Sequence, residues 1–317
     1  MSADEPLPAI NGALVLSRFD TLTQSGLVRY DKNQEIIEHT DGDLKFHFVL
    51  TNVLAQKPTL ATPQQQLLAE GQNGISLNLK PQRPGSDIDT NGYEIGDSSG
   101  SSHFLIANKF CFSRPHLMML TCDGNRRQHE PLDENDLEAA WTALLALNDA
   151  ARDYVVFYNC GKNSGCSRLH KHMQLMPLPA DGFAAAFLNS NAVKEPRVPF
   201  QWFYHRFVDR PITPATLASI YARLLQQATE AWENSAGDAV PDGEACPHNM
   251  AFTSRWMVVI PRRRAAVNKE AGVNSLGMLG VIAVATEREI DNWVRIGLIK
   301  SLMELGVARK ESVTQLK

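Results

Sequence analysis

The alternation of apolar and polar positions along the chain predicts a series of short strands. Side chains alternate in character at every second position, or are apolar throughout, which are the patterns of half-buried and fully buried strands. Residues 248–263 contain two strands joined at Ser254-Arg255, and a turn at Ser113-Arg114-Pro115 separates the strands at 103–112 and 116–122. The predicted strands lie within residues 44–54, 103–112, 116–122, 154–159 and 248–263.

Three longer segments have apolar residues at helical spacing and recognisable start signals. The first begins with Asp133 as its N-cap, and the second begins with Thr213 as N-cap followed by Pro214 in the first turn. The third opens with Thr286 and Glu289, which have the spacing of a capping box. The predicted helices are 133–149, 213–232 and 286–305, whereas the Gly-, Ser- and Asp-rich residues 84–102 predict a loop.

The order of these elements favours an α+β fold with an antiparallel sheet and flanking helices. Strands follow one another through hairpin-like turns, and the chain lacks the regular strand–helix alternation of a parallel sheet. The succession helix, strand, turn, strand occurs in both halves. We therefore expect an internally duplicated chain, in which the two halves form a pseudo-dimer.

Composition and charge narrow the class of protein. The chain has 317 residues, of which 44% are hydrophobic and 21% charged, and a formal net charge of −4. This balance is typical of a globular protein and argues against a partner such as nucleic acid, although a small anion needs only a local cationic pocket. The N-terminus lacks the pattern of a signal peptide, and no apolar run is long enough to span a bilayer. We expect a cytoplasmic protein that does not act at a membrane, and the same features are compatible with presence in the nucleus.

The five cysteines do not indicate a disulfide framework. Their number is odd, and no two have the C-x-x-C spacing of a structural zinc site. Reduced thiols in an intracellular protein are the simplest interpretation.

Residues Asn163–Pro179, with the sequence NSGCSRLHKHMQLMPLP, contain the strongest chemical signal. His170, His172 and Gln174 recur at every second position, so a strand would project them from one face. A single histidine in this place would be read as part of a half-polar sheet face. Two imidazoles and an amide directly after a Gly/Ser loop favour a functional site.

These residue types suit chemistry at phosphorus. A neutral imidazole is a good nucleophile, a second group beside it can hold its tautomer and orientation, and an amide can donate to a phosphoryl oxygen. In the preceding loop Gly165 allows close backbone approach, Ser164 and Ser167 can donate, and successive backbone N–H groups can form an anion site. Nucleophile, orienting group and oxyanion donors would then lie within one strand–loop unit.

The same segment resembles the active-site motif of the diadenosine tetraphosphate phosphorylases, also called ATP adenylyltransferases. These enzymes belong to the transferase branch of the histidine triad superfamily, together with galactose-1-phosphate uridylyltransferase. Further segments that resemble this family are LAQKP (54–58), NKFCFSRPHLMMLT (108–121), HNMAFTSRWMVVIPRR (248–263) and VNSLGMLG (273–280). The resemblance implies a histidine-triad-like sheet. It also implies a catalytic part over residues 1–195 and an ATP adenylyltransferase part over 196–317 that completes the sheet and the nucleotide site.

Carried over by motif, the resemblance assigns roles to individual residues. His172 would be the nucleophile that takes the adenylyl group, His170 would orient it, and Gln174 would contact the phosphoryl oxygens. The substrate-binding residues would be Lys57, Asn108, Lys109, Asn159, Ser164, Gly165, Cys166, Ser167, Asn274, Ser275 and Leu276.

The implied reaction is the reversible phosphorolysis of diadenosine tetraphosphate to ADP and ATP through an adenylyl-histidine. The partners would be the dinucleotide, ATP, ADP and inorganic phosphate, and the chain would act as a monomer. No tightly bound metal or other cofactor is expected, and Mg²⁺ would accompany the nucleotide. Two alternatives stay open: a hexose-1-phosphate nucleotidyltransferase, and a regulatory protein that binds nucleotide without turnover.

Some residues have a structural reading as plausible as the functional one. His116 begins an apolar strand and could border the site or be a buried structural histidine, and His248-Asn249 could end a strand or bind a ligand. The run Arg262-Arg263-Arg264 is most simply a solvated edge. One departure from the family pattern is Arg168-Leu169, which stands before the first histidine where Gln-Pro is expected.

Overall fold

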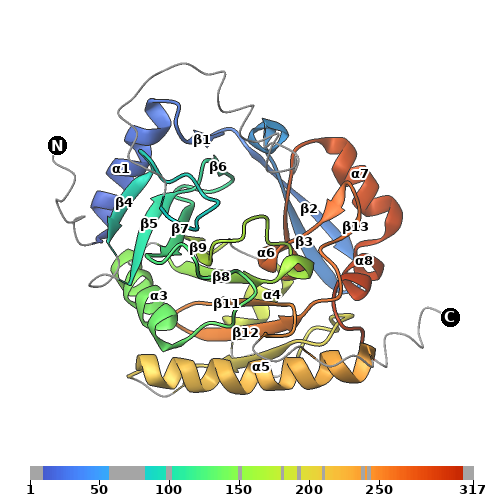
Figure 1. Ribbon diagram of the computed structural model, residues 1–317. Coiled ribbons are helices and arrows are strands. Elements are labelled where there is room, and N and C mark those ends of the chain that lie inside the picture. Colours follow the sequence, from blue (N-terminus) through green and yellow to red (C-terminus); the bar gives the residue numbers. More distant parts are fainter. Residues whose placement is uncertain are drawn as a thin grey trace.

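An eight-stranded antiparallel sheet runs through the middle of the molecule (Figure 1). The computed structural model describes residues 10–56, 83–97, 102–148, 152–179, 182–190, 194–208, 211–236, 240 and 244–309. In spatial order the strands are β10 (Phe203–Arg206), β12 (Trp256–Pro261), β11 (His248–Phe252), β8 (Tyr154–Cys160), β9 (His172–Pro177), β7 (Leu117–Thr121), β5 (His103–Ala107) and β4 (Glu94–Asp97). The expected α+β class with an antiparallel sheet is confirmed.

Helices and short ribbons surround this sheet. A second, three-stranded sheet contains β15 (Val281–Val284), β3 (Leu44–Leu50) and β2 (Glu35–Asp41), and two ribbons pair β1 (Arg29–Tyr30) with β6 (Phe110–Cys111) and β13 (Ala266–Asn268) with β14 (Ala271–Gly272). The α-helices are α1 (Gly12–Gln24), α3 (Glu134–Leu147), α4 (Phe183–Leu188), α5 (Pro214–Ala236), α6 (Ser275–Met278), α7 (Glu287–Ile296) and α8 (Leu298–Leu305). In the described part of the chain, the 3₁₀ helices η1 (Asn52–Gln56) and η2 (Lys162–Ser164) occur in loops.

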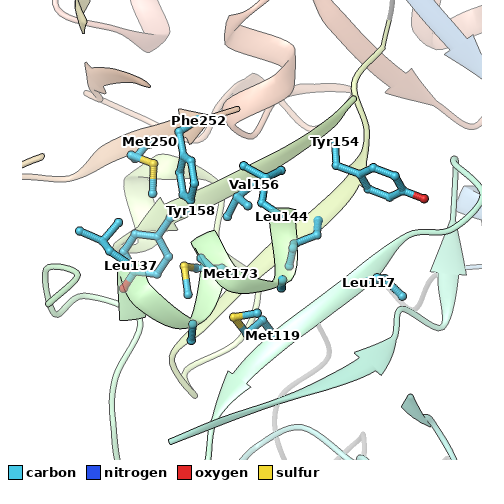
Figure 2. Close-up of a cluster of buried hydrophobic side chains, with 14 of the residues drawn as sticks. Leu117, Met119, Leu137, Leu144, Tyr154, Val156, Tyr158, Met173, Met250 and Phe252 are labelled. Atoms are coloured by element: carbon cyan, nitrogen blue, oxygen red, sulfur yellow. The ribbon is translucent and has the colours of Figure 1, made fainter. Parts of the chain in front are cut away.

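One face of the large sheet packs against α1, α3 and α5. Leu137 and Leu144 of α3 lie in the same buried cluster as Val156 of β8 and Met173 of β9 (Figure 2). They are seven residues apart on α3, which places both on one side of the helix. The alternation along β9 therefore sends Met173 and Leu175 into this core, and it leaves the side chains between them for the opposite face.

The opposite face packs against the small sheet and the C-terminal helices. Phe157 of β8 and Met176 of β9 share a buried cluster with Phe46 and Phe48 of β3 and with Trp293 of α7. The catalytic candidates therefore arise where this second core gives way to polar residues at the ends of β8 and β9.

The long helix predicted for residues 286–305 is instead two helices. Thr286 caps α7 as expected, with its hydroxyl 3.3 Å from the N–H of Glu289. Gly297 then adopts φ +83°, in the left-handed region, and separates α7 from α8. The break lets α8 turn its Leu298 and Leu302 into the core, where both are fully buried. Tertiary packing thus overrides a periodicity that continues through the glycine.

The other two helices begin where the sequence predicts. Asp133 caps α3 in a reciprocal capping box with Asp136, and the Thr213 hydroxyl accepts from the N–H of Thr216 at the start of α5. The segment predicted to be a loop, 84–102, is only partly one, because Glu94–Asp97 pairs with β5 as the edge strand β4. A strand this short has no periodicity that a sequence could reveal.

Residues on both sides of position 196 contribute to the large sheet. β10, β12 and β11 come from the second half and pair with β8 of the first half through β11. In that central pairing Phe157 lies opposite Ala251 and Asn159 lies opposite Asn249. The division into two parts at residue 196 and the internal duplication stay predictions, although the continuous sheet makes the two segments interdependent.

A buried ion pair ties the start of β9 to the helix layer. Nζ of Lys171 lies 2.6 Å from a carboxylate oxygen of Asp136, and the other oxygen lies 2.9 Å from Nε2 of His103. Burial alone would raise the pKa of Asp136, but the hydrogen bond to His103 and the Lys171 charge outweigh it and lower the pKa to about 2. Removing one partner of such a pair costs roughly 3–5 kcal/mol, because the other charge is left buried. Lys171 therefore anchors the stretch between the two candidate histidines.

Within the described residues, no helix combines the length and the apolar character needed to cross a membrane.

His248 makes the stability of the fold depend on pH. Its ring is fully buried, Nδ1 donates to the Cys246 carbonyl over 2.7 Å, and Nε2 accepts from the Tyr221 hydroxyl over 2.9 Å. Burial lowers the pKa of His248 to about 4, whereas the unfolded chain binds the proton near pH 6.5. Between these values the unfolded state holds more protons, so the free energy of unfolding falls as the pH drops from 6.5 towards 4.

We expect the free energy of unfolding to depend less on pH in the His248→Gln variant, with a slope below pH 6.5 that is smaller by about 1 kcal/mol per pH unit. The glutamine carries no titratable proton and can still accept from Tyr221. Urea unfolding at several values between pH 5 and 7.5 measures the slope, and the same substitution at the half-buried His39 of β2 is the control. A slope that is identical in wild type and His248→Gln would show that His248 is not the responsible group.

Candidate active site

His172 opens β9 with its tautomer set by the main chain. Nδ1 lies 2.7 Å from the carbonyl oxygen of His170, and a carbonyl can only accept, so Nδ1 carries the hydrogen and Nε2 carries the lone pair. The side chain is buried, and this burial lowers the pKa of His172 to about 4. At neutral pH the ring is therefore neutral, and its unprotonated Nε2 is chemically able to act as a nucleophile.

The imidazole of His170 makes its hydrogen bonds to residues other than His172. Its Nε2 lies 3.0 Å from the carbonyl oxygen of Thr121, and its Nδ1 lies 2.9 Å from the Ser86 hydroxyl. The His170 carbonyl makes the hydrogen bond to His172, and an orienting role of the His170 ring in the reaction stays a prediction. The ring secures the main chain that carries this carbonyl.

Asp87 holds the loop that leads into β9. Its two carboxylate oxygens each accept a main-chain N–H, from Leu169 and from His170, both over 2.9 Å. A proline at position 169, as the family pattern has it, could not donate the first of these bonds. The unusual Arg168-Leu169 pair thus matches a carboxylate that the sequence analysis did not identify, because an aspartate in a Gly/Ser-rich segment gives no specific signal.

Gln174 faces His116, so this histidine borders the site. Oε1 of Gln174 lies 2.8 Å from Nε2 of His116, which must donate, so the NH₂ end of the amide points elsewhere. Asn108 approaches the same His116 nitrogen at 3.3 Å through its amide nitrogen. His116 is buried at the site, and Gln174 and Asn108 are brought together around it.

The loop between β8 and β9 is a tight turn whose serines differ in role. The Ser164 hydroxyl donates to the Gly161 carbonyl over 2.6 Å and is fully buried, so it supports the turn rather than offering itself to a ligand. Ser167 is exposed. Burial raises the pKa of the Cys166 thiol to about 11, so this cysteine is protonated and is not a nucleophile at neutral pH.

Asn159, at the end of β8, is the centre of a polar network between the two halves. Its Oδ1 accepts from the amide of Asn249 and from the main-chain N–H of Ser275, both over 2.9 Å. Its amide nitrogen is consequently the end able to serve a ligand. The structure resolves the His248-Asn249 alternative: His248 points to the helix layer, whereas Asn249 lies in the site network.

The segment 274–276, expected to reach the ligand, is held within the protein. The Asn274 side chain caps α6 by accepting from the N–H groups of Leu276 and Gly277. The Ser275 hydroxyl lies 2.7 Å from Oδ1 of Asn159, and Leu276 is buried in the core. These contacts support the site through Asn159, and direct ligand contact by this segment stays a prediction.

Arg262 is not part of a solvated edge. The side chain is fully buried and donates to the carbonyl groups of Ser164, Val273, Arg264 and Leu305, as well as to Asn249. Among the described residues, no carboxylate forms an ion pair with it, and burial lowers its pKa to about 9. Arg262 therefore fastens the 162–166 loop from beneath with an uncompensated positive charge, which is favourable close to an anion site.

For the two predicted lysines, the structure gives little or no information about their place in the site. Lys109 is exposed, with Nζ 5.9 Å from the ring centroid of Phe110. Lys57 lies outside the described residues. No group of three or more His, Cys, Asp or Glu side chains in the described part of the chain could hold a metal ion.

Two family models match the chain and together cover most of it. The Ap4A phosphorylase N-terminal domain matches residues 27–188, and the ATP adenylyltransferase C-terminal domain matches residues 196–308. In Saccharomyces cerevisiae, diadenosine 5',5'''-P1,P4-tetraphosphate phosphorylase 2 is 27% identical over 256 residues, which are 72% of this chain and 77% of that protein. Protein APA1 of the same yeast is 24% identical over 300 residues, 87% of each chain.

A solved structure has the same fold. The crystal structure of yeast Ap4A phosphorylase Apa2 aligns with a TM-score of 0.71 at 20% identity, over 95% of this chain and 96% of that one. The complex of that protein with Ap4A aligns with a TM-score of 0.69 at 21% identity, over 95% of this chain and 99% of that one.

Gly165 is a position of the loop that leaves no room for a side chain. Its φ is +88°, and an added Cβ would lie 2.7 Å from the carbonyl oxygen of Val273. We expect Gly165→Ala to lower the free energy of unfolding by more than the about 1–2 kcal/mol that a left-handed backbone alone costs. Gly26→Ala is the matched control, because Gly26 has φ +77° and nothing within 4 Å of its added Cβ. Equal losses in urea unfolding of the two variants would show that the contact with Val273 is unimportant.

Proposed function

This chain belongs to the Ap4A phosphorylase family, and we propose from this membership that it catalyses the reversible phosphorolysis of diadenosine tetraphosphate to ADP and ATP. It is thus a nucleotidyltransferase. The observation that carries the proposal is the state of His172: a neutral ring whose Nδ1–H is held by the His170 carbonyl. That arrangement presents Nε2 to an electrophile without a prior proton transfer.

In the first step Nε2 of His172 attacks the α-phosphorus of the dinucleotide. A phosphorus–nitrogen bond forms, the bond to the bridging oxygen breaks, and ATP leaves. Positive charge develops on the imidazole, and the hydrogen bond from Nδ1 to the His170 carbonyl becomes stronger as it does so. The neutral ring and its acceptor are therefore matched to the charge that the reaction creates.

In the second step inorganic phosphate attacks the adenylyl-histidine. An oxygen of phosphate bonds to the same phosphorus, the bond to Nε2 breaks, and ADP leaves as the neutral imidazole is restored. Phosphate is anionic at neutral pH and needs little help from a base. The NH₂ ends of Gln174 and Asn159 are the proposed donors to the phosphoryl oxygens. The positive charge of Arg262 beneath the loop favours the anions.

The partners proposed beyond the dinucleotide are ATP, ADP and inorganic phosphate. Mg²⁺ would accompany the polyphosphate rather than occupy a site of its own, and no other cofactor takes part. Lys57, Lys109 and the main-chain groups around Gly165 are further proposed contacts for the phosphates. We propose a monomer that acts in the cytoplasm.

The two alternatives considered from the sequence are less well supported. A hexose-1-phosphate nucleotidyltransferase would belong to a different family, whereas both matching models describe the Ap4A phosphorylase and ATP adenylyltransferase family. A regulatory protein would not need the prepared tautomer of His172. Incubation with diadenosine tetraphosphate in the presence and absence of phosphate separates the proposal from both alternatives. ADP and ATP formed only with phosphate support the proposal, whereas no turnover of the dinucleotide would favour one of the alternatives.

When phosphate is withheld, we expect one adenylyl group per chain on His172. The adduct accumulates because the second substrate is missing, and its phosphoramidate bond survives alkali but not acid. Intact-mass measurement after an alkaline quench, followed by peptide mapping, detects and localises it.

His172→Ala should remain folded and form no adduct, whereas His39→Ala should behave like wild type. An adduct on another residue would reject His172 as nucleophile, and full turnover without any adduct would reject the two-step route.

Gln174→His should increase hydrolysis at the expense of phosphorolysis. An amide cannot act as a base towards water, whereas an imidazole can, so the variant should raise the ratio of AMP to ADP. Gln174→Ala removes the proposed donor together with the acceptor of the His116 N–H and supplies no base, so it should slow both routes by about 2–4 kcal/mol in activation free energy. Product partitioning at fixed phosphate is measured by chromatography. If the ratio in Gln174→His matches that of wild type, the choice of acceptor is made by other groups.

A further inference from the structure

The ladder between β8 and β9 stops just before the nucleophile. It pairs Tyr154 with Pro177 and continues to Phe157 opposite Gln174, after which the two strands separate. His172 retains its partner Leu120 in β7 on the other side. On the β8 side its main-chain N–H and carbonyl need other partners, because both are buried in the protein interior.

The side chain of Gln128 fills this gap. Oε1 accepts the N–H of His172 over 2.7 Å, and Nε2 donates to the His172 carbonyl over 2.9 Å and to the Asn159 carbonyl over 3.1 Å. Only 3% of Gln128 is exposed. Its carboxamide thus replaces a peptide group of a neighbouring strand, and it joins the residue that carries the nucleophile to the residue at the centre of the polar network.

The main chain of Gln128 is held as firmly as its side chain. Its N–H donates to the Leu169 carbonyl over 2.8 Å. Its carbonyl accepts from the N–H of Gly161 over 2.9 Å and from the Tyr158 hydroxyl over 3.1 Å. Gln128 therefore contacts the start of the loop, its end and the first residue of β9.

We propose that Gln128 is a positioning residue for phosphoryl transfer, which sets the distance and direction between Nε2 of His172 and the 161–167 loop. The inference rests on the proposed function of this site. It goes beyond it by assigning the alignment of the nucleophile to a side chain that does not touch the substrate.

The requirement is specific for an amide. The position needs one acceptor and two donor bonds at once, which a carboxamide supplies and which neither an ionised carboxylate nor a thioether does. Without the bonds the peptide at His172 would shift, and with it the carbonyl of His170 and the ring. A displacement of about 1 Å at a reacting group typically costs about 100-fold in rate.

The test compares Gln128→Met, which has a similar size and no hydrogen bonds, with Gln128→Glu, which keeps the acceptor for the His172 N–H. Single-turnover formation of the adenylyl-protein from diadenosine tetraphosphate should fall about 100-fold in the methionine variant and by less in the glutamate variant. KM for the dinucleotide should change less than threefold in both. Gln226→Met on the exposed side of α5 is the control and should match wild type.

A spectroscopic measurement separates positioning from a general loss of stability. In protein labelled with ¹⁵N-histidine, the ring nitrogens of His172 should report the single Nδ1–H tautomer in wild type and a mixture of tautomers in Gln128→Met, with assignment from His172→Ala. Urea unfolding confirms that the variants are folded under assay conditions.

The possible outcomes separate a failure of this inference from a failure of the proposed function. A folded Gln128→Met with a wild-type rate overturns the inference, as does a rate loss that arises entirely from KM. If Gln128→Met does not fold, Gln128→Glu decides by the same criteria. A wild-type protein that fails to convert the dinucleotide rejects the proposed function itself, which is a different result from a Gln128 variant that works normally.

Discussion

The hydrogen bond from Nδ1 of His172 to the carbonyl oxygen of His170 is the interaction on which the site depends. It leaves the lone pair on Nε2, and burial keeps the ring neutral. This geometry requires that the His170 carbonyl be fixed, and several groups fix it: Asp87 holds the preceding N–H groups, and Thr121 and Ser86 hold the His170 ring.

Residues from both parts of the chain form the site. Asn159 comes from β8, but the groups that orient its amide, Asn249 and Ser275, come from beyond residue 196. Arg262 also connects the two parts, because it joins the 162–166 loop to the end of α8. A buried guanidinium needs its hydrogen-bond acceptors in place, so the bond to the Ser164 carbonyl makes the loop and the second half stabilise one another.

Local patterns predicted much of the fold. The caps at Asp133 and Thr213 and the strands β8, β11 and β12 were all visible, because a cap or an alternation involves neighbours in the sequence. The break at Gly297 was not visible, since the apolar spacing continues through it and only the packing of Leu298 and Leu302 requires the turn. The prediction that Arg262 lies on a solvated edge is wrong for a similar reason. Composition favours exposure of three successive arginines, whereas five acceptors, four of them more than ten positions away, make burial of Arg262 favourable.

For the proposed site, the sequence by itself indicated the strand and the loop that form it and placed His172 and Gln174 on one face. Those inferences depend on residue type and on the two-residue period of a strand. Only the tertiary structure decided that the His170 carbonyl contacts the ring of His172, that His116 contacts Gln174, and that Ser86, Asp87 and Gln128 contact the same segment. Apart from the bond between His170 and His172, which are two positions apart, each of these contacts joins residues more than forty positions apart in the chain. A hydrogen bond between such distant residues leaves no periodic trace in the sequence.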